Sequence, residues 1–111
     1  MTVDEFRVMA LSLPESEERF HMNHPDFRVR GKIFATISLD GLSGIAKLKP
    51  EQQETLLRTE RNAFQPASGA WGKGGATVID LELADENVVK SVLVAAWRNI
   101  APKAILTRYD I

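Results

Sequence analysis

The chain contains no cysteine, little proline and no long run of apolar residues. Without cysteine, disulfides and thiolate metal sites are excluded. The uninterrupted apolar stretches are only a few residues long, whereas a membrane-spanning helix needs about 20. Seven glycines and five prolines are too few for a collagen-like chain, and 44% apolar with 26% charged residues excludes a charge-swollen disordered one. These absences predict an ordinary globular protein.

The size of the chain limits its architecture. A folded protein of 12.4 kDa exposes roughly 6,100 Å², against roughly 18,000 Å² when unfolded. One domain spanning residues 1–111 fits that size, and two do not. Fourteen basic and fifteen acidic residues give a net charge of −1, which weakens the case for a nucleic-acid partner. The first residues carry acids where a secretory signal would carry bases, so we expect a cytoplasmic monomer without membrane contact.

A capping box predicts the start of the first helix. Thr2 and Glu5 have the spacing in which the threonine oxygen accepts the Glu5 N–H and the glutamate reaches back. We expect Pro14 to end the helix, because proline has no N–H to donate and disfavours helical geometry before it. The apolar residues at helical spacing, which predict a buried face, are Val3, Phe6, Met9, Ala10 and Leu13.

In residues 20–49 the apolar residues recur at every second position, which is the period typical of strands. Phe27 and Val29 alternate with arginines, and a turn around Gly31 leads into residues 32–39. This pattern predicts a β-hairpin with one buried and one wet face.

Two registers are open for this hairpin. A three-residue turn at Arg30-Gly31-Lys32 would gather on one face Phe27, Val29, Ile33, Ala35 and Ile37. A two-residue turn would instead align Phe27 and Val29 with Phe34. Loop length fixes the register, and a slip by one residue inverts every side chain. The three-residue turn is preferred here because it keeps more apolar groups together.

The rest of the chain predicts two strands, two helices and a loop. They are a third meander strand over Ser43–Lys49 after a turn at Asp40-Gly41, a helix from Pro50 to about Arg61, a loop over Ala63–Gly75, a strand over Thr77–Leu83 and a helix capped by Asp85 and ended by Pro102. The last helix has an apolar stripe at steps of three and four, formed by Val89, Val92, Leu93, Ala96, Trp97 and Ile100. Strands joined by short turns pair antiparallel, and helices with one apolar stripe cover one face of a sheet. We therefore expect an α+β fold, with an antiparallel sheet built from a meander plus a further strand and with helices packed on one face.

Two glycine-containing segments resemble catalytic motifs but lack required residues. In Gly69–Gly75, Ala67 and Gly74 stand where a Walker loop needs glycine and serine or threonine, so its glycines are interpreted as turn residues with positive φ. The segment Gly41–Gly44 is followed by Ile45, where a nucleophile elbow needs glycine. No convergent acid–base pair is identifiable, so we predict no catalytic residues and no enzyme.

Two histidines lie at a spacing that could bind a metal. His21 and His24 flank the start of a strand, where their rings would point to opposite sides, and no spacing fixes further ligands. We therefore predict a surface or turn pair, no metal site and no cofactor.

The charges are distributed unevenly. Residues 4–18 carry five acids and one base, while residues 19–73 carry nine bases and five acids, a net charge of +4. If neighbouring strands gather these bases beside an aromatic ring, the surface can hold phosphates and stack bases. The candidate nucleic-acid-binding residues are Arg28, Arg30, Lys32, Lys47, Lys49, Trp71 and Lys73. The alternative is a solvated sheet face, because lysine and arginine also keep sheet edges soluble.

Four segments carry a family resemblance. They are the helix end Leu11–Pro14, the stretch His24–Ala35 (HPDFRVRGKIFA), the loop Trp71–Gly75 and the segment Ala96–Lys103. In this order, and over nearly the whole chain, they resemble the MmcQ/YjbR family of small bacterial proteins. The resemblance implies a CyaY-like (frataxin-like) α+β fold and DNA binding by a "double wing" arrangement, with no established enzymatic activity. It supplies no binding residues, so the candidates rest on charge.

Two functions follow as hypotheses. The leading one is non-enzymatic binding of double-stranded DNA, with phosphates contacted by the basic residues of strands and turns. The alternative is a protein- or small-ligand-binding domain that uses the sheet face and the loop around Trp71, with Phe64 nearby. A weaker third idea borrows hard-cation binding from the frataxin-like fold, although helix capping and solvation explain the acids involved. Those acids are Asp4, Glu5, Glu15, Glu17 and Glu18.

Overall fold

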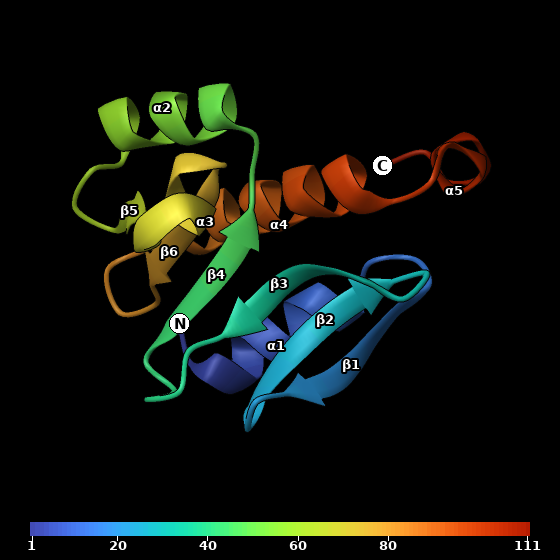
Figure 1. Cartoon of the computed structure of the whole chain (residues 1–111), viewed down its shortest axis with the longest axis horizontal. Coiled ribbons are helices and arrows are strands. Elements are labelled where there is room, and N and C mark those ends of the chain that lie inside the picture. The colour runs from blue at the N-terminus through green and yellow to red at the C-terminus, as the bar shows by residue number, and fades with distance from the viewer.

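The computed structural model describes residues 1–111, apart from the side chain of His21. Its helices and strands form a layered α+β structure (Figure 1). In chain order they are α1 (Val3–Leu11), β1 (Ser16–His21), β2 (His24–Val29), β3 (Lys32–Ile37), β4 (Ser43–Lys47), α2 (Pro50–Thr59), β5 (Phe64–Pro66), α3 (Gly69–Lys73), β6 (Ala76–Asp80), α4 (Glu86–Ile100) and α5 (Lys103–Arg108).

All six strands join one antiparallel sheet in the order β1-β2-β3-β4-β6-β5. Helices α1 and α4 lie on the same face of this sheet (Figure 1), while α2 and α3 pack against its β5–β6 end. The predicted α+β class and the meander of consecutive strands are confirmed. The CyaY-like comparison stays a prediction.

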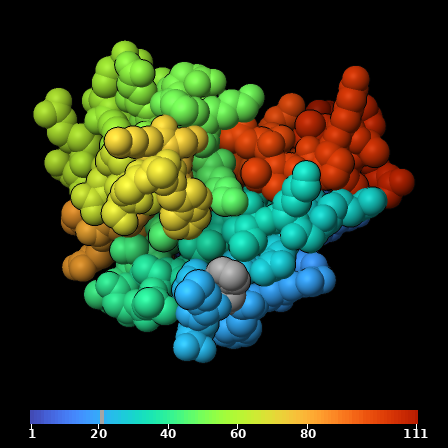
Figure 2. Space-filling model, in the orientation of Figure 1, coloured from blue at the N-terminus to red at the C-terminus, as the bar shows by residue number. Residues whose placement is uncertain are grey.

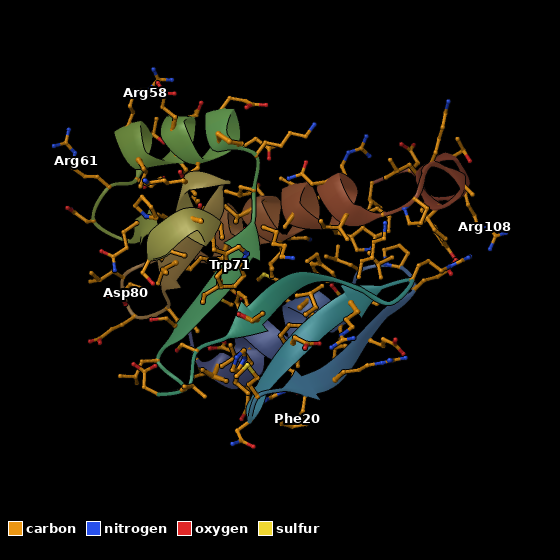
Figure 3. All side chains as sticks on the ribbon, viewed as in Figure 1. Phe20, Arg58, Arg61, Trp71, Asp80 and Arg108 are labelled. Carbon is orange, nitrogen blue, oxygen red and sulfur yellow. The ribbon has the colours of Figure 1, made fainter. Side chains whose placement is uncertain are left out.

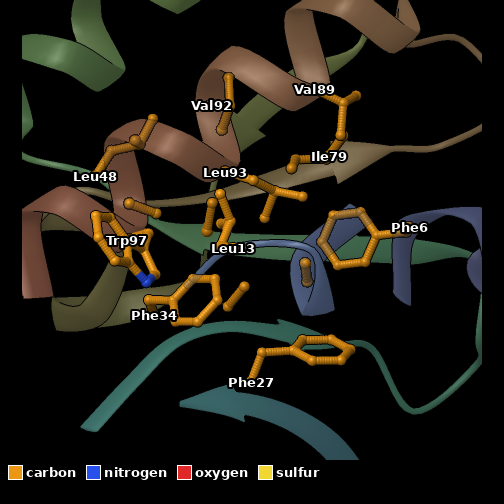
Figure 4. Packing of buried hydrophobic residues seen from close by; sticks show 14 of the residues in the cluster. Phe6, Leu13, Phe27, Phe34, Leu48, Ile79, Val89, Val92, Leu93 and Trp97 are labelled. Carbon is orange, nitrogen blue, oxygen red and sulfur yellow. The ribbon is translucent and has the colours of Figure 1, made fainter. Parts of the chain in front are cut away.

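The core lies between α4 and the sheet (Figure 4). The apolar stripe predicted for the last helix is confirmed, because Val89, Leu93 and Trp97 have no exposed surface. They face Phe27 and Ile79, which the sheet contributes and which are equally buried. Burying side chains of this size stabilises a fold by about 1.5–3 kcal/mol each, so this layer dominates the stability of the protein.

The helix starts form as the sequence predicts. Glu5 N–H donates to Thr2 Oγ1 over 3.1 Å and Thr2 N–H to Glu5 Oε1 over 2.8 Å, which completes the capping box. The Asp85 carboxylate accepts the N–H groups of Asn87 and Val88 at the start of α4. Helix α1 already ends at Leu11, so the predicted end at Pro14 is three residues too late.

The β2–β3 hairpin has a two-residue turn, so the preferred three-residue turn is wrong. Val29 pairs directly with Lys32, and the intervening Arg30 and Gly31 have φ values of 51° and 80°. Positive φ at both central residues is the type I′ geometry, whose twist matches that of the flanking strands. Turn geometry therefore decides the register here, and not the number of apolar residues on one face.

A β-bulge brings both sets of apolar residues into the core. Arg28 pairs with Ile33, but Phe27 pairs with Ala35, so Phe34 is an extra residue on β3. Phe34 and Ala35 are adjacent and still only 0% and 1% exposed, which regular alternation does not allow. The two registers considered from the sequence each contain part of the true packing.

Four short elements are absent from the sequence prediction. In β1 the consecutive charged residues Glu17, Glu18 and Arg19 interrupt the alternation of apolar and polar residues that predicts a strand. The segment predicted as a loop contains β5 and α3. Pro102 ends α4 as expected. It also stands directly before the first turn of α5, a position that proline suits.

Two predicted strands are too long at their ends. The strand expected over Ser43–Lys49 ends at Lys47. The last strand stops at Asp80, whose carboxylate accepts the N–H groups of Glu82 and Leu83 and turns the chain away. Leu83, predicted as part of the strand, is consequently 62% exposed.

No helix in the described part of the chain is long and apolar enough to cross a membrane. The cytoplasmic location, the monomeric state and the single-domain organisation stay predictions.

Candidate nucleic-acid interface

The seven candidate residues lie toward one end of the sheet in two groups. The hairpin group at the β2–β3 turn is Arg28, Arg30 and Lys32, and the groove group, where β4 ends beside α3, is Lys47, Lys49, Trp71 and Lys73. Strands β3 and β4 pair only between residues 35–37 and 44–46 and diverge beyond them (Figure 1). The structure thus gathers the candidates at two places instead of one.

Arg28 is bound to a buried carboxylate. Its Nε and Nη2 donate to the two carboxylate oxygens of Asp26 over 2.8 and 3.0 Å. Asp26 is fully buried, and 19% of the Arg28 side chain is exposed. Donation of these hydrogen bonds to the Asp26 carboxylate raises the pKa of Arg28. On the paired strand, Glu17 lies opposite Arg28 and bonds Arg19 over 2.9 Å, so this part of the sheet is balanced in charge.

Arg30 shares one carboxylate with the C-terminal segment. Its Nε donates to Glu15 Oε1 over 3.0 Å, while Glu15 Oε2 accepts the Tyr109 hydroxyl at 3.0 Å and Arg108 Nη1 at 3.4 Å. The hydrogen bonds from Tyr109 and then Arg30 hold the pKa of Glu15 below its usual value. Lys32 is exposed beside this cluster and forms no ion pair with any described side chain.

Three members of the groove group, all but Lys73, line a surface pocket, which we call the Lys–Trp groove. It has a volume of about 390 Å³, and Lys47, Lys49, Trp71 and Asn99 are part of its lining. None of the described residues that line it is acidic. Trp71 is 43% exposed and projects over β4 (Figure 3). Figure 2 shows α3 and the β4–α2 connection meeting on the same surface of the molecule.

Hydrogen bonds to the backbone fix the position of the two groove lysines. The Asn99 amide donates to the carbonyl oxygen of Lys47 over 3.1 Å and to Gln52 Oε1 over 2.8 Å. Gln52 Oε1 also accepts the N–H of Lys49 at 2.9 Å, at the start of α2. The lysine backbones are therefore held by side chains of α2 and α4, while their ammonium groups form no ion pair with described residues.

A buried glutamine ties α2 to the groove. The Gln53 side-chain amide lies within hydrogen-bonding distance of the carbonyl oxygens of Gly72 (3.1 Å) and Ala76 (2.9 Å) and of Thr77 Oγ1 (3.2 Å). Gln53 is only 9% exposed, and Thr77 is fully buried. These contacts connect three elements around Trp71 and make Gln53 a structural support of the groove.

We expect Gln53→Met to destabilise the protein by about 2 kcal/mol, because methionine has a similar length but donates no hydrogen bond to the carbonyl oxygens of Gly72 and Ala76 or to Thr77 Oγ1. Urea denaturation measures the change in free energy of unfolding. The matched control is Gln65→Met on an exposed position of β5, which should change it by less than about 0.5 kcal/mol. Equal effects of the two substitutions would contradict this role for Gln53.

Two glycines in and after α3 allow close backbone approaches, one to Ala67 before the helix and one to the β4–α2 connection. A Cβ on Gly72 would lie 1.7 Å from the Ala67 carbonyl oxygen, and one on Gly75 would lie 1.9 Å from the Leu48 carbonyl oxygen. Gly69 and Gly75 have φ values of 69° and 116°, as expected for turn glycines. At Gly72 the close approach, and not a positive φ, requires glycine.

The largest described pocket lies elsewhere, between α1 and α4, and has a volume of about 680 Å³. Asp4, Glu5 and Glu86 line it together with a single base, Lys90. An acidic surface repels polyanions, so this pocket does not fit the leading hypothesis.

The described residues include no group of three or more histidines or acids placed to hold a metal ion. Of the acids considered for a hard cation, Asp4 and Glu18 bond Arg7. The interpretation of His21 and His24 lies partly outside the described residues, because the His21 side chain is not among them. The absence of metal and cofactor stays a prediction.

Sequence patterns predict no role at the interface for Gln52, Gln53 or Asn99, and they suggest for Glu15 only the binding of a cation. The sequence does contain a signal for Asn99, because this residue lies in one of the segments that carry the family resemblance. Gln53 lies three and four residues before Leu56 and Leu57, so it shares their face of α2. This spacing is the sequence signal that distinguishes the buried glutamine from Gln52.

Comparisons with known proteins agree with this fold. The model of the YjbR family matches residues 11–99 of the chain. No curated protein of similar sequence is found. The chain is similar to a solved structure, the crystal structure of protein DR2400 of Deinococcus radiodurans, described with the domain DUF419. The TM-score is 0.78 at 21% sequence identity, over 93% of this chain and 80% of the other. At this identity the likeness concerns the fold alone.

Proposed function

This chain belongs to the YjbR family, and from that premise we propose that it binds double-stranded DNA without catalysing a reaction. The observation that carries the proposal is the Lys–Trp groove. Two lysines without ion pairs among the described residues flank the exposed ring of Trp71, and no acid lines the groove. Lysines neutralise backbone phosphates, and in duplex DNA an apolar ring packs on bases by inserting between base steps.

The candidate residues take different parts in this proposal. Lys47 and Lys49 contact phosphates from the groove, and Lys73 adds a third charge at the end of α3. The hairpin group supplies a second contact through Lys32, because the guanidinium of Arg28 is held by Asp26. With a net charge of −1, the protein should bind duplex DNA weakly and with strong salt dependence.

We expect Lys47→Ala/Lys49→Ala to weaken binding to a 20-base-pair duplex by about tenfold at 50 mM salt. Each lost phosphate contact lowers the slope of log affinity against log salt by about 0.9, so the double variant should lose a slope of about 2. Fluorescence anisotropy at several salt concentrations measures both quantities. Trp71→Ala should weaken binding by a similar factor with an unchanged slope, because stacking releases no counterions.

The matched control is Lys90→Ala, which removes a positive charge beside the acidic pocket and should change the affinity by less than twofold. If the wild-type protein does not bind duplex at low salt, the proposal fails. An equal loss for Lys90→Ala and Lys49→Ala would mean that only net charge matters, and the groove would not be the site.

A second candidate function is small-ligand binding in the same groove. Its volume of about 390 Å³ falls within the range of about 300–1,000 Å³ that is usual for such sites. Titration with mononucleotides, followed by tryptophan fluorescence in wild type and in Trp71→Ala, separates the two functions. Saturable binding of a mononucleotide with no binding of duplex would favour this alternative.

A further inference from the structure

We propose that Arg30, Arg108 and Tyr109 form a second anion-binding site for a backbone phosphate of nucleic acid, and that Glu15 of the chain itself occupies the site when no nucleic acid is bound. The inference rests on the proposed function for the identity of the ligand. It concerns a different surface, because none of these four residues lines the Lys–Trp groove.

The geometry around Glu15 is that of a bound oxyanion. Three donors from two distant segments converge on its two oxygens: Arg30 Nε at 3.0 Å from Oε1, and the Tyr109 hydroxyl and Arg108 Nη1 at 3.0 and 3.4 Å from Oε2. A phosphodiester carries one negative charge shared by two non-bridging oxygens, as a carboxylate does. Arginine binds both groups through the same N–H geometry.

The internal carboxylate is accessible to replacement. About half of the Arg30 side chain and 64% of the Arg108 side chain are exposed, and Glu15 is 27% exposed. Ion pairs at such exposed positions contribute little to stability. Exchange of Glu15 for an external phosphate therefore costs the fold little, while a polyanion gains two arginine contacts.

The surroundings of the site favour an anion. The segments that supply its donors, residues 30–32 and 103–111, contain four bases and one acid, Asp110. Lys32 and Lys103 are both exposed. Figure 2 shows the tip of the β2–β3 hairpin next to the end of α4 and α5, so these charges belong to one end of the molecule.

We expect Glu15→Gln to bind a 20-base-pair duplex about threefold to tenfold more tightly than the wild-type protein at 50 mM salt. Glutamine keeps the size of the side chain and an acceptor for Tyr109 but removes the competing charge. The salt slope should steepen by about 0.9, the value of one further phosphate contact. The gain in affinity should disappear in Glu15→Gln/Arg30→Ala, because this variant lacks one of the two arginines that bind the phosphate.

Two controls separate this site from general electrostatics and from loss of structure. Glu86→Gln makes the same change in net charge beside the acidic pocket and should leave the affinity within twofold of wild type. Glu15→Ala removes the same carboxylate in a second way and should also tighten binding, even if Glu15→Gln fails to fold. An equal gain for Glu86→Gln would overturn the inference.

Failure of this inference and failure of the proposed function give different results. If the wild-type protein binds duplex through Lys47 and Lys49 but Glu15→Gln binds no tighter, only the inference is overturned. If neither protein binds duplex, the proposed function fails, and the site is tested with inorganic phosphate. The Nε–Hε NMR signal of Arg30 in Glu15→Gln should then shift on titration with phosphate, and an unchanged signal would overturn the inference as well.

Discussion

Gly75→Ala is expected to lower the free energy of unfolding by about 3 kcal/mol or more, whereas Gly74→Ala, one residue earlier, should be close to neutral. At Gly75 the backbone has a φ of 116°, and a Cβ would lie 1.9 Å from the carbonyl oxygen of Leu48. Neither the conformation nor the space admits a side chain, since a backbone oxygen cannot swing aside. Gly74 has a φ of −78°, and its nearest neighbour would be 3.4 Å from the Cβ.

Urea denaturation of the two variants tests this contrast directly, because they differ by one position and add the same methyl group. Gly75→Ala should also weaken DNA binding, since the contact with Leu48 holds α3 and Trp71 against the β4–α2 connection. Equal stability of the two variants would show that α3 does not pack as described.

Trp97→Ala is expected to destabilise the protein by about 3–5 kcal/mol, the usual range for removing a fully buried aromatic side chain. Trp97 has no exposed surface, and its indole N–H donates to the Pro14 carbonyl oxygen over 3.0 Å. The ring therefore packs in the core beside Phe34 and Leu48 (Figure 4), and its hydrogen bond connects α4 to the turn after α1.

The second tryptophan is the matched control for the first. Trp71 is 43% exposed, so Trp71→Ala should cost less than about 1 kcal/mol of stability while weakening DNA binding. Thermal and urea denaturation measure stability, and Trp97→Phe should fall between wild type and Trp97→Ala because it loses the hydrogen bond and part of the volume. A comparable loss of stability for both alanine variants would contradict the distinction between a core and a surface tryptophan.

Much of the fold follows from local rules. The capping box at Thr2, the cap at Asp85 and the apolar stripe of α4 form where the sequence predicts them, because each depends on neighbouring residues. The register of the β2–β3 hairpin does not follow from such rules. It depends on the turn at Arg30-Gly31 and on the bulge at Phe34, and the apolar pattern alone is compatible with either choice of turn.

The candidate site shows the same limit at longer range. Composition identifies the basic residues and Trp71, but it cannot show that Asp26 holds Arg28 or that Glu15 holds Arg30. The partner of Arg30 is 15 residues away in sequence, and that of Asn99 is Lys47, 52 residues away. Contacts between distant segments decide which charges remain available, and they depend on strand pairing that the sequence pattern leaves open.

The order β4-β6 in the sheet has a consequence for how the molecule folds. Strands β1 to β4 are joined by short turns, but β4 meets β6 only after the excursion of residues 48–75. Closing a longer loop costs more chain entropy, and contacts between distant segments are slow to form. Lys49, Trp71 and Lys73 all lie on that excursion, so we expect the meander to form early and the Lys–Trp groove to be assembled last. The surface proposed to bind DNA would then exist only in chains that have completed folding.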